Sequence, residues 1–384
     1  MKKAILLLKE FEKLGYQAYI VGGSVRDYIL KSDSFDIDIA TDATPDEVMQ
    51  HFKSLPTGIR YGTVTVFFKG SKYEVTTFRK DFVYRDNRRP DKVIFSNNIK
   101  DDVKRRDFTV NGMYLDKDMK VIDLIGGQKD LEKKIVKTIG KPDDRFNEDA
   151  LRMLRAFYLV SKLNFEIDHA TLESIKRKKE LITKVSAERI YNEIEKISNH
   201  PYSHKALILM IQTGIHQYLP GLTKGIVTLA TYKINLKGDD FFIGAFFFND
   251  QKIDKFWKLS NKKKKLYNNV LSILNTNEKI SNELFYQYTF EELKTAGRIG
   301  EEFNLAGYSE KRFIELYESL PIKDDKELKI TNKKIISLVN RKPGHWLTEL
   351  RNDMIKEILN NRLSNNEEEI YKYIKRRKDI HEKK

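Results

Sequence analysis

The chain has 384 residues, too many for one ordinary hydrophobic core, so two or more domains are expected. The net charge of +15 favours a polyanionic partner, because clustered lysines and arginines neutralise phosphates and release counterions. The sequence contains no cysteine, which excludes a disulfide framework and a thiolate metal site and fits a cytoplasmic protein. No apolar run reaches the roughly 18 residues that a membrane span needs, so no membrane partner is expected.

Residues 1–140 have the pattern of a mixed α/β domain. In chain order, the apolar spacing predicts an amphipathic helix over 1–14 rather than a signal peptide, a strand over 16–23, a helix over 25–31, a strand over 35–41, a helix over 45–53 and a hairpin over 62–78 that turns at Lys69-Gly70-Ser71. The charged segment 79–95 is too polar for a core and is predicted to be a mobile loop. A polar cluster over 105–116 and a short strand over 120–127, closed by two glycines, complete this part.

Beyond Pro142 the apolar period becomes helical, and helices punctuated by Gly, Pro or Asn are predicted almost to the end of the chain. The fold class is therefore α+β: a head with a small mixed β-sheet, followed by all-helical neck, body and tail domains. We place the head at 1–140, the neck at 141–200, the body at 201–295 and the tail at 296–384.

Three carboxylates in the head suggest a metal site. Asp36 and Asp38 are two residues apart on a predicted strand, so both side chains should face one side of the sheet. Two carboxylates there could share hard divalent cations, and Mg²⁺ leaves ligand positions open for substrate phosphates. Glu74, on the strand expected to pair beside them, is a candidate third carboxylate; the alternative is a solvent-facing glutamate.

The residues just before this pair suggest a phosphate site. Gly22 and Gly23 lie between a predicted strand and a helix start, where free backbone N–H groups can approach a polyphosphate. Arg26 could add a fork of donors to the same phosphates, with Asp27 orienting it or capping the backbone. A lone glycine pair is typical of an ordinary turn, and a lone DxD of a solvated strand edge. Their order and spacing together indicate one site at the mouth of a small sheet.

The motifs GGSVRD, DID, EVTTFR, RRDFTVNGM and NEDALRMLR, in this order over about residues 20–200, resemble the tRNA nucleotidyltransferases. These are the CCA-adding enzymes of the bacterial class II type, in the DNA polymerase beta superfamily, and VSAERIYNEIEKI fits the family's last shared element. Later residues match mainly in helical character, and the family commonly has a proline where this chain has His345. The resemblance implies template-independent addition of the terminal C, C and A to tRNA from CTP and ATP. Two Mg²⁺ ions at Asp36 and Asp38 would assist attack of the tRNA 3′-hydroxyl on the α-phosphorus, with release of pyrophosphate.

The cluster RRDFTVNGM contains a candidate for sugar recognition. By resemblance, Asp107 accepts a hydrogen bond from the ribose 2′-OH while Arg106 contacts phosphate, and Asn111 belongs to the same nucleotide-binding cluster. The alternative is an ordinary helix N-cap at Asp107, and both roles are compatible.

Asp149, Arg152 and Arg155 follow one another at three-residue spacing and are predicted to share one face of a helix. A solvated intrahelical salt bridge is the alternative. By resemblance, this helix serves as a protein template through Asp149 and Arg152, with Glu148 positioning the helix start and Arg155 stacking on the base or contacting phosphate. Cytosine and adenine both present an amino donor beside a ring-nitrogen acceptor. Uracil and guanine present the reverse order and would leave buried groups unsatisfied, at roughly 1–3 kcal/mol each.

A flexible loop in this family helps the pocket change from C to A, and by resemblance it corresponds here to the segment with Tyr84, Arg85, Asp86, Arg88, Arg89 and Pro90. Its presence favours an enzyme able to add A, without excluding one that adds A alone. Two rival functions stay open: an A-adding or poly(A) polymerase of the same family, and a non-catalytic RNA-binding protein with a retired head. Poly(A) polymerases typically carry an Arg-Arg-Phe element where this chain has TGIRYGTVTVFF, which disfavours that rival.

Basic segments of the helical half, over 176–180, 261–269 and 331–346, are expected to bind the phosphates of a tRNA acceptor arm by shape. The sequence leaves the oligomeric state open.

Overall fold

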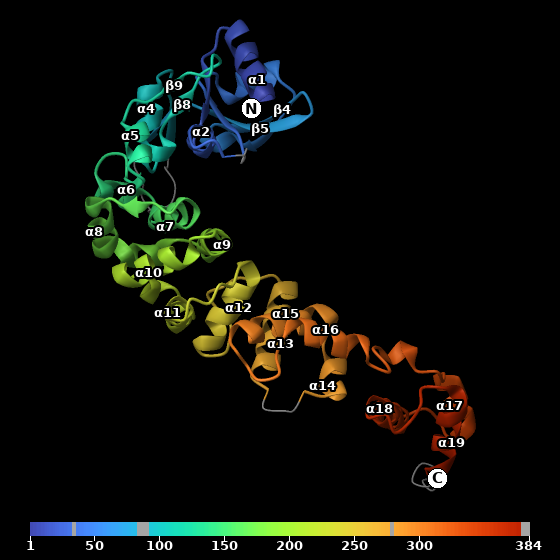
Figure 1. Cartoon of the computed structure of the whole chain (residues 1–384). Coiled ribbons are helices and arrows are strands. Elements are labelled where there is room, and N and C mark those ends of the chain that lie inside the picture. The colour runs from blue at the N-terminus through green and yellow to red at the C-terminus, as the bar shows by residue number, and fades with distance from the viewer. Residues whose placement is uncertain (33–35, 83–91, 277–279, 378–384) are drawn as a thin grey trace. The chain divides into compact units, whose positions relative to one another are not determined.

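The computed structural model divides the chain into two compact units, one of residues 1–238 and 255–258 and the other of 239–254 and 259–384. The structure describes residues 1–32, 36–82, 92–276 and 280–377. Strands and helices mix in the N-terminal part, coloured blue to teal in Figure 1, whereas the rest, from green to red, is mostly helical. This confirms the α+β class.

The head elements follow the predicted order with shorter strands. Its helices are α1 (Lys2–Lys13), α2 (Gly23–Ile29), α3 (Pro45–His51), α4 (Ile99–Lys104) and α5 (Gly127–Glu132). Its strands are β1 (Ala18–Val21), β2 (Asp38–Thr41), β3 (Ser54–Gly58), β4 (Thr63–Phe68), β5 (Ser71–Thr77), β6 (Arg79–Phe82), β7 (Lys92–Phe95), β8 (Tyr114–Leu115), β9 (Val121–Ile122) and β10 (Ile135–Val136). The predicted turn between β4 and β5 is confirmed, with Lys69 and Gly70 at positive φ.

The main sheet has seven strands in the order β3-β4-β5-β2-β1-β8-β9. The β2–β5 pair is parallel and the other neighbours are antiparallel, so the predicted mixed sheet is confirmed. In this register Val21 of β1 lies opposite Asp38 of β2, and Asp38 lies beside Glu74 of β5. The sheet therefore brings the glycine turn after Val21 and two of the nominated carboxylates to one end.

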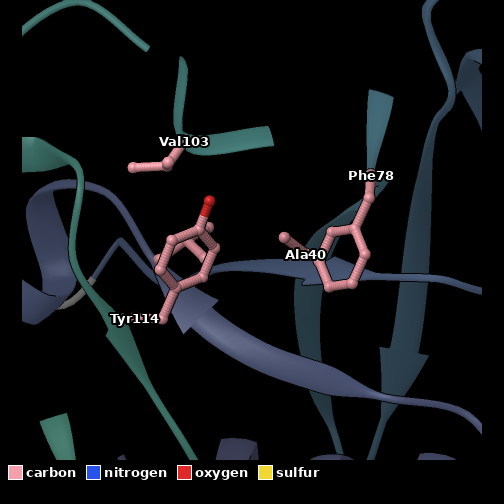
Figure 2. Close-up of a cluster of buried hydrophobic side chains, with 5 residues drawn as sticks. Ala40, Phe78, Val103 and Tyr114 are labelled. Carbon is pink, nitrogen blue, oxygen red and sulfur yellow. The ribbon is translucent and has the colours of Figure 1, made fainter. Parts of the chain in front are cut away.

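A buried cluster joins this end of the sheet to α4. Ala40, Phe78, Val103 and Tyr114, labelled in Figure 2, pack together with Val21. Val103 comes from α4 and Tyr114 from β8, so apolar burial fixes α4 against the central strands. The residues that follow α4 are thereby positioned next to the carboxylates of β2.

The segment 79–95 was predicted to be a mobile loop, and this is wrong at both of its ends. Arg79–Phe82 and Lys92–Phe95 pair as the antiparallel strands β6 and β7, with Arg79 opposite Phe95. Backbone hydrogen bonding in the ladder outweighs the polar composition. The loop residues Tyr84, Arg85, Asp86, Arg88, Arg89 and Pro90 lie outside the described residues.

The helix predicted to carry Asp149, Arg152 and Arg155 on one face is interrupted, so the placement of Asp149 on that helix is wrong. Helix α6 (Pro142–Glu148) ends at Asp149, whose backbone is extended with φ −147 and ψ 103, and α7 (Leu151–Leu163) then begins. The helices that follow in the first unit are α8 (His169–Lys178), α9 (Ala187–Asn199), α10 (Ser203–Thr213) and α11 (Thr223–Thr231). A short strand, β11 (Glu166–Ile167), pairs in parallel with β10. The prediction of an all-helical neck is therefore wrong at these two residues.

The second unit is built from helices α12 (Gly238–Phe248), α13 (Asn261–Leu274), α14 (Asn282–Gln287), α15 (Phe290–Glu302), α16 (Glu310–Glu318), α17 (Asn332–Val339), α18 (His345–Leu359) and α19 (Glu367–Arg376). Arg298 of α15 forms a fork with Asp240 of α12, at 2.6 and 3.1 Å, which ties these helices together. In the part of the chain that the structure describes, no helix has the length and apolar character to cross a membrane. The boundaries of the proposed neck, body and tail stay predictions.

Candidate active site

A cavity of about 310 Å³ in the first unit gathers most of the nominated residues. Its wall comprises Gly22, Gly23, Asp38, Arg105, Arg106, Asp107, Asn111, Asp149, Leu151, Arg152, Arg155 and Arg189. Arg26, Asp36 and Glu74 are the nominated residues that do not line it. Five arginines face three aspartates in this wall, an excess of positive charge that suits a polyphosphate.

The glycine turn has a backbone that requires glycine. Gly22 joins β1 to α2 with φ 74 and ψ −142, a conformation that side chains rarely allow. A Cβ atom on Gly22 would lie 3.7 Å from Oδ2 of Asp38, so this turn passes directly over the carboxylate. The predicted convergence of the glycine turn and the DID motif is therefore confirmed for Asp38.

The three carboxylates lie less regularly than predicted. Strand β2 begins at Asp38, so Asp36 precedes the strand, and the prediction that both lie on it is wrong. Desolvation at the cavity, with smaller contributions from the nearby carboxylates of Glu74 and Asp36, raises the pKa of Asp38 to about 6 against the opposing charge of Arg106. Among the described residues, no group of three or more His, Cys, Asp or Glu side chains is placed to hold a metal ion.

Behind the cavity wall lies Asp102, a fully buried carboxylate that sequence reasoning missed. It accepts hydrogen bonds from Arg105, from Arg106 at 2.8 Å and from the hydroxyl of Tyr114 at 2.9 Å. Burial opposes ionisation, but the two guanidinium groups outweigh it and lower the pKa of Asp102 to about 2. Arg105 and Arg106 follow Asp102 by three and four residues, a spacing that could have revealed the pairing. Asp102 thus holds the guanidinium groups of Arg105 and Arg106, two residues of the cavity wall, in place.

Asp107 lies in the cavity wall with Arg155 as its partner. The Nε of Arg155 donates to Oδ2 of Asp107 at 2.6 Å, and the amide of Asn111 approaches Oδ1 at 3.5 Å. Although burial alone would raise it, the pKa of Asp107 is lowered, chiefly by the charge of Arg155. The alternative role as a helix N-cap is wrong, because the following 3₁₀ turn begins after Phe108 without a side-chain cap.

Asp149 and Arg152 meet in the cavity wall across the break between α6 and α7. Asp149 accepts from the backbone N–H of Leu151 at 3.2 Å and from Arg189 of α9 at 2.7 Å. Arg152 donates to Glu148 at 2.6 Å and to the backbone carbonyl of Arg105 at 2.8 Å. Arg189 was not nominated from the sequence; its only signal is its place within the element VSAERIYNEIEKI.

Arg26 lies beneath the glycine turn and is only 2% exposed. Its Nε donates to Asp27 at 2.8 Å and its Nη1 to Asn111 at 2.7 Å. The prediction that Asp27 orients Arg26 is confirmed. Contact between Arg26 and a substrate phosphate stays a prediction.

Family models match three stretches of the chain. Residues 18–137 match the Poly A polymerase head domain, residues 164–226 the "Probable RNA and SrmB- binding site of polymerase A", and residues 249–374 a tRNA nucleotidyltransferase domain 2. The head match contains the turn, the carboxylates and the cluster after α4. The other two matches fall in the helical part.

Full-length relatives extend these matches. The chain is 37% identical to a CCA-adding enzyme of Bacillus cytotoxicus, over 97% of this chain and 98% of that one. It is 36% identical to the CCA-adding enzyme of Bacillus subtilis, over 97% of each chain. Among solved structures, the Bacillus stearothermophilus CCA-adding enzyme in complex with CTP is 32% identical and superposes with a TM-score of 0.88, over 99% of this chain and 98% of that chain.

Proposed function

The chain belongs to the family of CCA-adding enzymes, the tRNA nucleotidyltransferases, and on that premise we propose that it completes or repairs tRNA 3′ ends with C, C and A, taken from CTP and ATP without a nucleic-acid template. The observation that carries this function is that one cavity is lined by Gly22, Asp38, Asp107, Asp149, Arg152 and Arg155. The wall therefore offers candidate residues for binding the phosphates, the sugar and the base of the nucleotide.

Enzymes of this family generally use divalent metal ions, and we propose that two Mg²⁺ ions bind here at Asp36 and Asp38. The donor set fits, because oxygen ligands suit Mg²⁺ and the crowding of Asp38 by Asp36 and Glu74 would be relieved by a cation. Two carboxylates suffice, since Mg²⁺ usually retains water and phosphate ligands. Bound metal would neutralise charge on the triphosphate and favour deprotonation of the attacking hydroxyl. Glu74 acts beside them as a third carboxylate, one strand away from Asp38.

The chain's own residues bind and orient the nucleotide. The backbone N–H groups of Gly22 and Gly23 approach the phosphates, and Arg106, held by Asp102, presents its guanidinium to the same group. Asp107 accepts a hydrogen bond from the ribose 2′-OH, with Arg155 and Asn111 holding its carboxylate in place. This positioning leaves the α-phosphorus open to in-line attack by the tRNA 3′-hydroxyl, with pyrophosphate as the leaving group.

Base selection is assigned to the break between α6 and α7. Asp149 accepts from the exocyclic amino group of cytosine or adenine, and Arg152 donates to the neighbouring ring nitrogen. Arg189 and Glu148 orient these two side chains through contacts of 2.7 and 2.6 Å. Such pre-orientation favours selection, because a base with the reverse donor and acceptor order would leave buried groups unpaired.

The helical second unit and the basic neck segments bind the tRNA acceptor arm through its phosphates. The net charge of +15 supports this role. We place the reaction in the cytoplasm, where tRNA, CTP and ATP occur together.

The experiment that tests this function is extension of a tRNA that ends at its discriminator base. With CTP alone the product should grow by two nucleotides, and with CTP and ATP by three, ending in A. Growth only with ATP on a tRNA already ending in CC would identify an A-adding enzyme, and long A tails a poly(A) polymerase. Retention of the tRNA with no extension in the presence of Mg²⁺ would identify a non-catalytic RNA-binding protein.

A further inference from the structure

Helix α7 is attached to the head by three cationic side chains at successive points along its length. Arg152 near its start donates to the carbonyl of Arg105, and Arg155 forks onto Asp107. Lys162 near its end donates to Oδ2 of Asp27 at 2.9 Å. Arg155 and Lys162 are seven residues apart, two helical turns, so they project from the same face. The first two contacts lie in the cavity wall, whereas the third lies outside it.

The third contact leads directly to the glycine turn. Asp27 is nearly buried and accepts on one oxygen from Lys162 and on the other from Arg26. The guanidinium of Arg26 supports Gly23 from below, since a Cβ atom there would lie 3.2 Å from its Nη2. Lys162 is therefore linked through two side chains to the turn proposed to hold the triphosphate.

A second series of contacts leads from Arg26 back to α7, so that the two series together form a closed ring. Arg26 also donates to the side-chain oxygen of Asn111 at 2.7 Å, and Asn111 approaches Asp107, which Arg155 holds. The ring of six side chains thus leaves α7 at Lys162 and returns to it at Arg155. Such a ring fixes α7 at two points relative to the head, which a single contact cannot do. Rotation of α7 about the Asp107–Arg155 contact would break the Lys162–Asp27 pair.

The Lys162–Asp27 ion pair is buried enough to hold α7 in place, yet the fold should tolerate the loss of the Lys162 charge. The Lys162 side chain is 18% exposed and that of Asp27 is 5% exposed, so water screens their attraction weakly. Without Lys162, Asp27 still keeps Arg26 as a counter-ion, so no isolated buried charge is created. The effect of removing the Lys162 charge should therefore fall on the placement of α7 more than on folding.

We propose that Lys162 is a positioning residue for nucleotide selection: through Asp27 and Arg26 it fixes the distance between the triphosphate turn at Gly22-Gly23 and the base-reading residues at the start of α7. The inference rests on the proposed function and adds to it a residue outside the cavity. While the Lys162–Asp27 pair is intact, a nucleotide is accepted only if its triphosphate fits the glycine turn and its base fits Asp149 and Arg152 at the same time. Without the pair, this requirement is relaxed.

Three variants test the proposal in steady-state extension of a tRNA that lacks its terminal CCA. Lys162→Met removes the charge and keeps the aliphatic length, and Lys162→Arg keeps the charge. Lys205→Met is the control, because Lys205 forms a more exposed pair with Glu166 at 2.6 Å and neither residue lines the cavity. The readout is the ratio of kcat/KM for CTP to that for UTP, with the melting temperature of each variant measured in parallel.

Lys162→Met should lower the CTP-to-UTP ratio by on the order of tenfold, less than the roughly 100-fold loss that a misplacement of about 1 Å can cause. Lys162→Arg should keep the ratio of the unmodified chain, and Lys205→Met, which removes a lysine from a more exposed pair, should keep it as well. Equal ratios in the unmodified chain, Lys162→Met and Lys205→Met would overturn the role of Lys162, as would a loss in Lys162→Arg as large as in Lys162→Met. Failure of the unmodified chain to incorporate C would overturn the proposed function itself.

Discussion

Replacing Asp102 by asparagine removes a buried charge on which the cavity wall depends. Its carboxylate is fully buried between Arg105, Arg106 and Tyr114. The two guanidinium groups outweigh the burial cost and lower the pKa of Asp102 from 3.8 to about 2, which corresponds to roughly 2.5 kcal/mol of folding free energy at neutral pH. Asp102→Asn should therefore lower the melting temperature of the first unit by roughly 5 to 10 °C. It should also raise KM for CTP, because Arg106 loses its anchor.

The stabilising contribution of Asp102 should decrease as the pH falls. A carboxyl whose pKa is lower in the folded state stabilises the fold fully above its unfolded pKa, and the contribution is lost as the pH falls through the folded pKa. With a folded pKa of about 2, roughly half of the contribution remains at pH 3. The difference in unfolding free energy between the unmodified chain and Asp102→Asn should thus shrink between pH 7 and pH 3 in urea titrations.

Asp118→Asn is the control, since Asp118 is an exposed aspartate of the head whose side chain is 67% exposed and pairs with Lys117 at 3.5 Å. It should leave both the melting temperature and KM unchanged. The reasoning would be refuted if Asp102→Asn were as stable as Asp118→Asn at pH 7, or if its deficit did not depend on pH.

Three further predictions concern the site itself. Asp36→Asn should abolish incorporation of C from CTP in the extension assay without lowering the melting temperature, and full activity would remove its metal role. Gly22→Ala should lose about 1–3 kcal/mol of stability and most activity, because its φ of 74 is strained for alanine; Gly70→Ala, at φ 77 in a hairpin with open space around it, should lose stability but keep its activity. Arg189→Met should release Asp149 and raise incorporation of U relative to C, measured by single-nucleotide extension; an unchanged ratio would show that Asp149 needs no such support.

Local sequence patterns predicted the head well. The alternation of apolar residues predicts strand β1 before the glycine turn and strand β2 after helix α2. The turn at Lys69-Gly70 sets the register of the hairpin that carries Glu74. The parallel pairing of β2 with β5 then places Glu74 beside Asp38, as expected. These features depend on neighbours in the chain or on a single strand register, which composition and periodicity encode.

Contacts between distant residues account for what was missed. NEDALRMLRA consists mostly of strong helix formers, yet the helix is interrupted at Asp149, whose carboxylate binds Arg189 forty residues later. Arg26 was nominated for phosphate contact, but its donors are directed to Asp27 and Asn111, the latter 85 residues away. The pairing of Lys162 with Asp27 spans 135 residues, and no pattern in the sequence signals it.

The central claim is that the protein, through Asp149 and Arg152, chooses which nucleotide is added. The most direct measurement is single-nucleotide extension of a tRNA lacking CCA with each of the four nucleoside triphosphates, for the unmodified chain and for Asp149→Ala and Arg152→Ala. The account predicts that the unmodified chain incorporates only C at the first position and that both variants accept U and G as well. Unchanged selectivity in both variants would contradict it.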